Sequence, residues 1–204
     1  RSGSVTGVQT CALPIFDKFD ADYQFVAEID DVFYVRTTEG APNARVIAVP
    51  AQENGAAKLR DVIPERESAL VDATIVGGRV VAQYLKDAYS VVAVTDLEGR
   101  SLYDLKLPGY GQAAGFAGDA KDPETFFVYT DFLTPGSISG LNVVTGQTRA
   151  FRASKIAADT SPYVTEQVFY RSKDGTRVPM FVTHKRNLVK NGQAPLMLYG
   201  YGRF

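Results

Sequence analysis

Cysteine and histidine are almost absent from this chain of 204 residues, which has one of each. The cysteine, Cys11, lies in the opening stretch, residues 1–15, which has the period of neither a strand nor a helix. The rest of the chain therefore offers no disulfide, thiolate metal site or thiol nucleophile. Because His184 is the only histidine, an ordinary zinc site is also excluded.

The sequence also lacks a cluster of basic residues, a long apolar run and tryptophan. Its net charge is -1 and its pI is near 5.9, which argues against nucleic-acid binding, since phosphate recognition needs concentrated Lys and Arg. No apolar run approaches the roughly eighteen residues of a membrane-spanning helix. Hydrophobic residues make up 45% and aromatic residues 11% of the chain, as in a globular, β-rich core. We therefore expect a soluble protein that binds neither nucleic acid nor a membrane.

The first fifteen residues, RSGSVTGVQTCALPI, differ in character from everything that follows. They resemble the translation of a sequencing adapter at the edge of an assembled contig. We interpret residues 1–15 as an artefact of this kind, and a disordered natural tail is the alternative. A secretory signal is not indicated, because the stretch has a single Arg and no sustained apolar core.

From residue 16 to about residue 152, short strands separated by turn residues recur with a period of about 46 residues. We predict strands in one copy at residues 80–85, 90–96 and 101–105, and in the next copy at 125–130, 137–142 and 148–151. An earlier copy places them at residues 32–36, 45–49 and 59–63. Carboxylates such as Asp30 and Asp31, Asp119, Asp122 and Glu124 fall next to Gly or Pro or between strands, and we assign them to turns.

A period of this length built of strands is typical of β-propeller blades, each a four-stranded sheet packed against its neighbours. The repeat therefore predicts a mainly β fold with about three blades. Since closed propellers need at least four blades, this would be part of a propeller. The alternative is an ordinary all-β domain whose hairpins look alike.

The last forty or so residues have a different pattern. Two period-2 runs, residues 167–170 and 178–183, flank Lys173-Asp174-Gly175, and Asp-Gly supplies the positive φ values of a tight hairpin turn. Residues 194–199 form a nearly unbroken apolar run, which predicts a strand buried on both faces of a sheet. This run leads into Gly200-Tyr201-Gly202, and a strand followed by such a loop is where α/β hydrolases build part of an oxyanion hole.

Three blocks of this region, VFYRSKDGTRVPMFVTHK (168–185), Asn191-Gly192 and LYGYGRF (198–204), closely resemble the prolyl oligopeptidase family of serine peptidases. The resemblance extends upstream through residues 42–47 and 131–136, so it covers nearly the whole chain after residue 16. Within the family, the chain is most similar to the prolyl endopeptidase branch. Arg203 departs from the usual Gly-Gly-Phe ending of that branch.

The resemblance implies a seven-bladed propeller that precedes most of an α/β-hydrolase domain. We accordingly expect residues 16–155 to be a partial propeller, 156–204 to be the first strands of a truncated hydrolase domain, and the chain to be an internal fragment. The family's Gly-Gly-Ser-x-Gly-Gly nucleophile motif is not in the sequence, and its catalytic Asp and His come later in the family. We therefore interpret His184 as a structural residue at a strand end.

The implied activity is hydrolysis of short peptides on the carboxyl side of proline, with the propeller restricting access to the active site. Tyr201 matches a tyrosine whose phenol donates a hydrogen bond to the oxyanion, and Phe204 matches a phenylalanine that lines the proline pocket. The resemblance implies no metal or organic cofactor and a monomeric full-length protein. Without its nucleophile, base and acid, the chain alone is expected to be inactive.

Two alternatives remain open from the sequence. One is the oligopeptidase B-like branch, which prefers basic residues, although Phe204 differs from its usual Gly-Ser-Tyr-Gly continuation. The other is a non-catalytic propeller used for binding, for which Arg203 is the only support. The sequence leaves the compartment, cytoplasm or periplasm, undecided.

Overall fold

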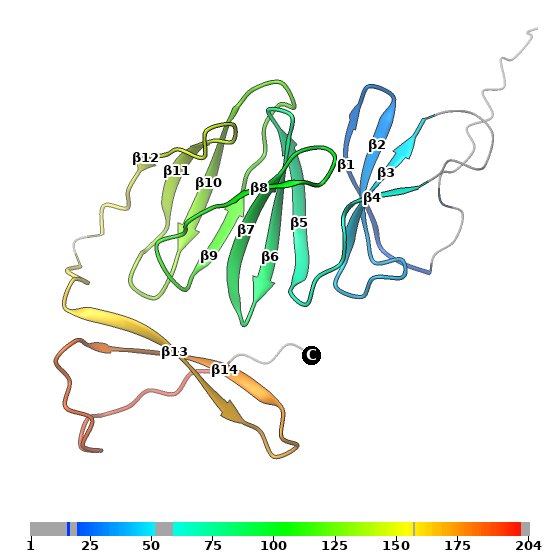
Figure 1. Cartoon of the computed structure of the whole chain (residues 1–204). Helices are drawn as coiled ribbons and strands as arrows, with labels where there is room; N and C mark the ends of the chain where they lie inside the picture. The colour runs from blue at the N-terminus through cyan, green and yellow to red at the C-terminus, as the bar shows by residue number, and fades with distance from the viewer. Residues whose placement is uncertain (1–15, 17–19, 52–58, 157, 201–204) are drawn as a thin grey trace, which may run out of the picture.

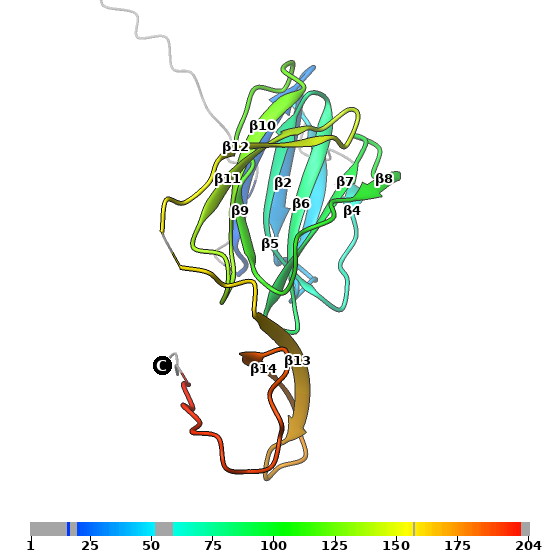
Figure 2. The ribbon, with the colours of Figure 1, turned by 90° about the vertical axis from the view of Figure 1, so that its left-hand side faces the viewer.

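The computed structural model describes residues 16, 20–51, 59–156 and 158–200. Every regular element among them is a β-strand, and the strands form three four-stranded sheets and one hairpin. The three sheets stand side by side, and the hairpin lies at one end of them (Figure 1). A view turned by 90° places the hairpin at the same end (Figure 2).

Each four-stranded sheet is antiparallel and is built from consecutive strands, as expected of a propeller blade. Blade 1 contains β1 (Tyr23–Ile29), β2 (Val32–Thr37), β3 (Arg45–Pro50) and β4 (Arg60–Ile63). Blade 2 contains β5 (Ala69–Val76), β6 (Arg79–Lys86), β7 (Tyr89–Thr95) and β8 (Ser101–Asp104). Blade 3 contains β9 (Gln112–Gly115), β10 (Glu124–Thr130), β11 (Ser137–Asn142) and β12 (Thr148–Arg152). The mainly β fold of three four-stranded blades is confirmed, and the blades do not close into a ring.

The sequence-predicted strands are the second, third and fourth of each blade, whereas β1, β5 and β9 were not predicted. β9 shows why: it has only four residues, QAAG, with little strand preference of their own. Its conformation comes from pairing with β10, where Ala114 lies opposite Val128 and Ala113 opposite Tyr129. Pairing between strands thus supplies what the local pattern lacks.

Tight turns join several neighbouring strands. Asp30 and Asp31, between β1 and β2, both have positive φ (50° and 61°), as a two-residue type I′ turn requires. The same pattern occurs at Gly77 and Gly78 (53° and 68°), between β5 and β6. The turn assignment of Asp30 and Asp31 is therefore confirmed, and Glu124 instead begins strand β10.

A second kind of turn repeats with the blades. After β7, the Asp96 carboxylate accepts the N–H groups of Glu98 and Arg100 at 3.0 and 2.8 Å. At the end of β11, Asn142 Oδ1 likewise accepts the N–H groups of Val144 and Thr145 at 3.1 and 3.0 Å. An Asx side chain that accepts downstream N–H groups holds such a turn in place. The sequence repeat thus corresponds to a structural one.

Two apolar clusters fill the spaces between the blades. The cluster between blades 1 and 2 includes Tyr34, Val46, Ile63, Leu70 and Val80. The cluster between blades 2 and 3 includes Val81, Val92, Phe116, Phe127, Tyr129 and Leu141. Because β6 contributes Val80 to one cluster and Val81 to the other, blade 2 buries both of its faces.

The hairpin consists of β13 (Tyr163–Arg171) and β14 (Arg177–Lys185), so the predicted hairpin is present and longer than expected. Its turn differs from the prediction. Only Gly175 has a positive φ (85°), and the loop is closed by a 2.9 Å hydrogen bond from Ser172 N–H to the Thr176 carbonyl. The five-residue loop needs one left-handed residue rather than the two of a type I′ turn.

The predicted buried strand at residues 194–199 is wrong for this structure. None of these residues belongs to a strand, and Leu196, Met197 and Leu198 are 84%, 87% and 81% exposed. An apolar run becomes a buried strand only where a neighbouring strand accepts its backbone hydrogen bonds and other layers cover its faces. Among the described residues, this run has neither a paired neighbouring strand nor a layer that covers its faces.

Candidate functional site

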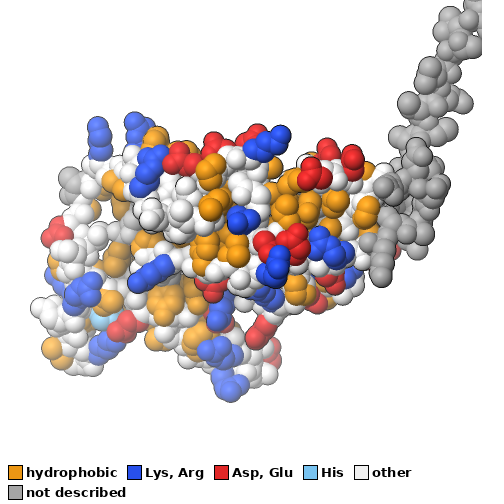
Figure 3. Space-filling model, turned by 45° about the horizontal axis from the view of Figure 1, so that its top comes forward, with side chains coloured by type: hydrophobic (Ala, Val, Ile, Leu, Met, Phe, Trp, Pro, Cys, Tyr) orange, Lys and Arg blue, Asp and Glu red, His pale blue; other side chains and the backbone are white. Residues whose placement is uncertain are grey.

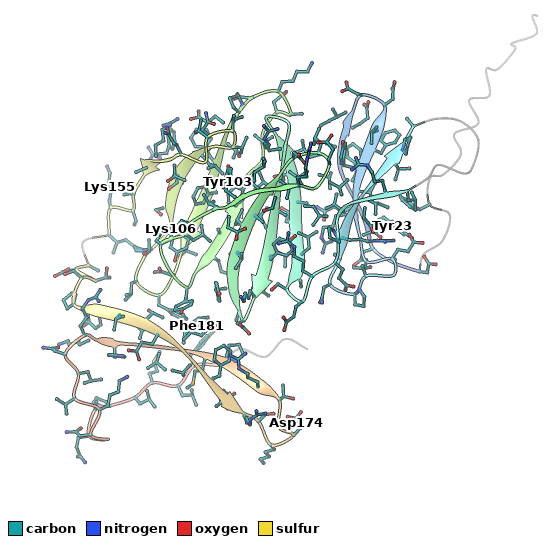
Figure 4. All side chains as sticks on the ribbon, viewed as in Figure 1. Tyr23, Tyr103, Lys106, Lys155, Asp174 and Phe181 are labelled. Atoms are coloured by element: carbon teal, nitrogen blue, oxygen red, sulfur yellow. The ribbon has the colours of Figure 1, made fainter. Side chains whose placement is uncertain are left out.

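The place where sheets and hairpin meet brings together residues far apart in the sequence. We call this contact the seam. Its members are Asp87, Tyr89, Tyr110 and Phe132 from blades 2 and 3, and Gln167, Arg177 and Phe181 from the hairpin. Figure 4 shows Phe181 on the side of the hairpin that is turned toward the sheets. The seam therefore connects the propeller blades to the segment that leads toward Tyr201.

Asp87 makes the polar contacts of the seam. It lies in the turn between β6 and β7, where Asp87 and Ala88 have φ values of 46° and 69°. Gln167 Nε2 donates to the Asp87 carbonyl oxygen at 2.7 Å, and Arg177 Nη1 lies 3.9 Å from Asp87 Oδ1. One turn residue thus meets both strands of the hairpin.

Phe181 makes the apolar contacts. Its ring centroid lies 5.9 Å from that of Tyr110 and 5.8 Å from that of Phe132. Tyr110 in turn packs edge-on against Tyr89 at 5.2 Å. These separations are within the range of favourable aromatic pairs. Tyr110 and Phe132 are 39% and 64% exposed, so the cluster lies at the rim of the seam rather than in a closed core.

The loop that carries Phe132 is held by a buried phenol. Tyr129 is 1% exposed and donates from its hydroxyl to Asp131 Oδ2 at 2.8 Å. Asp131 Oδ1 accepts the N–H groups of Leu133 and Thr134 at 2.8 and 2.6 Å. Burial, followed by the bond to the Asp131 carboxylate, raises the pKa of Tyr129, so the phenol stays protonated as a donor. Sequence reasoning missed this network, because a Tyr in a strand and an Asp just past the end of that strand form no recognisable motif.

His184 lies on β14 next to the strand end, as predicted, with its side chain only 10% exposed. Its Nδ1 is 2.8 Å from the Lys185 carbonyl oxygen, and its Nε2 is 3.4 Å from Glu166 Oε2. Lys190 Nζ also lies 3.0 Å from Glu166 Oε2. Contacts first with Lys190 and then with His184 lower the pKa of Glu166. This group ties the hairpin to the following segment, and no serine of the described residues is bonded to the imidazole.

The two predicted site residues, Tyr201 and Phe204, lie outside the described residues, as do Gly202 and Arg203. The described segment ends at Gly200, where an added Cβ would meet no atom of the other described residues within 4 Å. The seam therefore marks the approach to the predicted oxyanion loop and not the loop itself.

No group of three His, Cys, Asp or Glu side chains that could hold a metal ion occurs in the described part of the chain. Within the same residues, no helix is long and apolar enough to cross a bilayer. Lys and Arg side chains are interspersed with Asp and Glu on the face shown in Figure 3.

A surface hollow lies on blade 1, whereas the seam is formed by blades 2 and 3. The hollow is lined by Val32, Ala48, Pro50, Leu59 and Arg60. Among the described residues, its walls are mainly apolar and Arg60 is the charged side chain that lines it. Ligand sites usually combine apolar walls with several convergent polar groups, which the described lining of this hollow does not supply. We therefore regard the seam, and not the hollow, as the candidate functional region.

Comparison with known proteins gives consistent matches over most of the chain. The model of a family described as prolyl oligopeptidase, N-terminal beta-propeller domain, matches residues 6–154. Prolyl endopeptidase of Elizabethkingia meningoseptica is 36% identical over 196 residues, which cover 96% of this chain and 28% of that protein. Prolyl oligopeptidase A of Galerina marginata is 31% identical over 195 residues, which cover 93% of this chain and 26% of that protein.

Solved structures agree. A structure from an analysis of two prolyl endopeptidases and their inter-domain dynamics matches with a TM-score of 0.79 and 38% identity, covering 88% of this chain and 27% of that one. Prolyl oligopeptidase B from Galerina marginata without ligand matches with a TM-score of 0.78 and 26% identity, covering 87% and 26%. The chain thus spans little more than a quarter of the length of these relatives. An alignment of 196 residues also extends beyond the three blades into the hairpin.

Proposed function

Because this chain belongs to the prolyl oligopeptidase family of serine peptidases, we propose that it is part of an endopeptidase that hydrolyses short peptides on the carboxyl side of proline. The observation that carries the proposal is the 36% identity to a prolyl endopeptidase over 96% of the chain. That match includes the hairpin and the segment toward Gly200, which lie beyond the propeller match at residues 6–154. Peptide substrates follow from the peptidase names of these relatives.

The proposed domain boundary lies between residues 155 and 156, with the propeller before it and the start of the hydrolase domain after it. Blade 3 ends with β12 at Arg152, and the hairpin begins with β13 at Tyr163. Residues between two independently paired sheets are the usual place for a boundary. The blades would cover the hydrolase domain and restrict entry to short peptides.

Tyr201 is the proposed oxyanion donor. Its phenol would donate a hydrogen bond to the negative oxygen of the tetrahedral intermediate, and such a donor is typically worth about 3 kcal/mol in the transition state. Phe204 would offer a flat apolar surface to the proline ring. The sequence of this chain has no Gly-Gly-Ser-x-Gly-Gly motif, so the nucleophile would have to come from elsewhere in the protein, and the chain alone would not catalyse.

The first test uses the protein expressed from its whole reading frame and three blocked p-nitroanilide peptides, which end in proline, alanine or arginine. We expect hydrolysis of a blocked Gly-Pro p-nitroanilide and little hydrolysis of the matched Gly-Ala compound. Cleavage only after arginine would instead assign the oligopeptidase B-like branch. Failure on all three, together with no labelling by a fluorophosphonate, would leave a non-catalytic binding protein. The 204-residue chain alone is the control and should not be labelled.

The second test addresses the oxyanion donor. Tyr201→Phe should lower kcat by about 100-fold or more with a small effect on KM, because the lost bond forms only in the transition state. Tyr170→Phe is the matched control, since Tyr170 lies on the hairpin and its side chain is exposed. Equal kcat values for the two variants would remove Tyr201 from the mechanism.

A further inference from the structure

We propose that Phe181 and Asp87 are positioning residues that clasp the hairpin onto blades 2 and 3 and so hold the segment that leads to Tyr201. The clasp itself is an intramolecular contact and is independent of the activity. Its effect on catalysis rests on the proposed function.

The register of the hairpin places its seam residues on one face. Gln167 and Phe181 lie directly opposite each other in the β13–β14 pairing, so their side chains point to the same face. Arg177 is four residues from Phe181 along β14 and therefore lies on that face too. All three hairpin residues of the seam therefore lie on this one face. Glu166 and His184 lie on the opposite face. Glu166 contacts Lys190, which follows the hairpin, and His184 contacts Lys185, the last residue of β14.

The blade residues of these contacts come from three separate connections between strands. Asp87 lies between β6 and β7, Tyr110 between β8 and β9, and Phe132 between β10 and β11. Both figures of the ribbon place the hairpin at this end of the sheets (Figures 1 and 2). A hairpin held by connections from two blades cannot shift along one blade without losing its contacts to the other.

Each of these anchors is also held by contacts within the blades, independently of the hairpin. Asp87 lies in a two-residue turn with positive φ values, and Tyr110 is packed against Tyr89. Phe132 follows Asp131, whose carboxylate accepts the N–H groups of the two residues after Phe132 and so holds this loop. Preorganised partners lose little conformational freedom on contact, so weak interactions can add. Each aromatic pair should change the ratio of docked to undocked hairpins by roughly two- to twelvefold.

Because the chain has no tryptophan, Phe181→Trp introduces a unique fluorophore into the clasp. We expect its emission to be shifted to shorter wavelength and protected from acrylamide, relative to Phe151→Trp at an exposed site on β12. Adding Tyr110→Ala or Phe132→Ala to Phe181→Trp should shift the emission to longer wavelength and increase quenching. Far-UV circular dichroism of each variant checks that the sheets remain folded.

Solvent-exposed emission from Phe181→Trp in a folded chain, or emission that neither alanine substitution changes, would overturn the clasp. If a variant does not fold, Asp87→Asn in the Phe181→Trp background provides a milder test. It keeps the carbonyl that Gln167 contacts and removes only the charge near Arg177. The clasp predicts that salt, which screens the Asp87–Arg177 pair, increases acrylamide quenching of Phe181→Trp. Asp87→Asn should increase quenching by itself and abolish this response to salt. An unchanged salt response in Asp87→Asn contradicts the clasp.

The positioning role is tested in the full-length protein with a proline peptide. Phe181→Ala should lower kcat/KM several-fold without changing the pH profile, and Phe181→Tyr, which keeps the ring, should restore it. The positioning role would be overturned if Phe181→Trp fluorescence shows a docked hairpin while Phe181→Ala leaves kcat/KM unchanged. A wild-type protein with no peptidase activity would instead overturn the proposed function, while the fluorescence test would still decide the clasp.

Discussion

Blades 2 and 3 are copies of one sequence repeat, but they differ in how much of each sheet is buried. In blade 2, Val80, Val81 and Ala82 are consecutive in β6 and all are fully buried, because a neighbouring blade covers each face. In blade 3, buried residues of β10 alternate with Phe126 and Val128, which are 37% and 44% exposed. Side chains of similar apolar character thus end up inside or outside according to the neighbours of the sheet.

The outer face of blade 3 shows what this difference leaves behind. Phe126 packs edge-on against Phe151 at 4.9 Å, and the Arg149 guanidinium lies over both rings at 5.6 and 5.8 Å. Arg149 also forms a 2.7 Å ion pair with Glu124. A long cationic side chain can cover apolar surface while its charge remains in water. The face is therefore partly shielded by side chains of its own blade, and its burial contributes less stability than that of the packed faces of blade 2.

The largest difference should appear at two neighbouring phenylalanines. Phe127→Ala should lower the free energy of unfolding by about 3–5 kcal/mol, since Phe127 is buried and stacked on Phe116 at 4.9 Å. Phe126→Ala, on the open face of the same strand, should cost about 1 kcal/mol. Urea unfolding followed by circular dichroism measures both. Equal losses would mean that the two faces of blade 3 are equally packed in solution.

The joint between blades 1 and 2 should be nearly as sensitive. Gly99 has φ of 87°, and a Cβ there would lie 1.9 Å from the Val62 carbonyl oxygen. Gly99→Ala should therefore destabilise the chain by about 3 kcal/mol, through backbone displacement and left-handed strain. Gly136→Ala is the control: φ is 45°, but an added Cβ would meet no atom of the described residues within 4 Å, so strain alone should cost about 1–2 kcal/mol. Similar melting temperatures for the two variants would contradict the close packing of this joint.

A smaller effect is expected at the buried phenol of blade 3. Tyr129→Phe removes the hydrogen bond to Asp131 and should cost about 1–2 kcal/mol at neutral pH. The pKa of Tyr129 is raised in the folded state, so its contribution is complete below the unfolded pKa of about 10 and is lost as pH rises above it. Urea midpoints of wild type and Tyr129→Phe should therefore converge above pH 10. A constant difference across this range would argue against the buried donor.

The smallest effect belongs to the exposed hairpin turn. A hydrogen bond from Ser172, followed by one from the Thr176 N–H, lowers the pKa of Asp174 to about 2. A lowered pKa stabilises the folded state above the unfolded value of about 3.9, and this stabilisation is lost as pH falls from about 4 to about 2. Asp174→Asn should remove this pH-dependent contribution to the stability of the folded state while leaving the blades unchanged. NMR titration of the Asp174 carboxyl carbon measures it directly, and an ordinary pKa would refute the effect.

Much of the fold could be predicted from local patterns. The period of about 46 residues located three strands of each blade, and Asp30-Asp31 and Asp174-Gly175 located two turns, although the second turn differs in type from the prediction. The strands β1, β5 and β9 were missed, because the pairing of β9 depends on β10 and not on its own residues. For the candidate site, the resemblance named Tyr201 and Phe204, which lie outside the described residues, and no local pattern indicated the seam.

The sequence by itself determined the strand-and-turn repeat, the hairpin and the family, because each depends on residues close together in the chain. The tertiary structure alone decided which faces are covered, and it left residues 194–199 exposed although their apolar pattern predicts burial. It also decided the seam, where Gln167 meets Asp87 across 80 residues of sequence. The physical reason is that period and turn chemistry act over a few residues, whereas burial and docking depend on which surfaces the folded chain brings together.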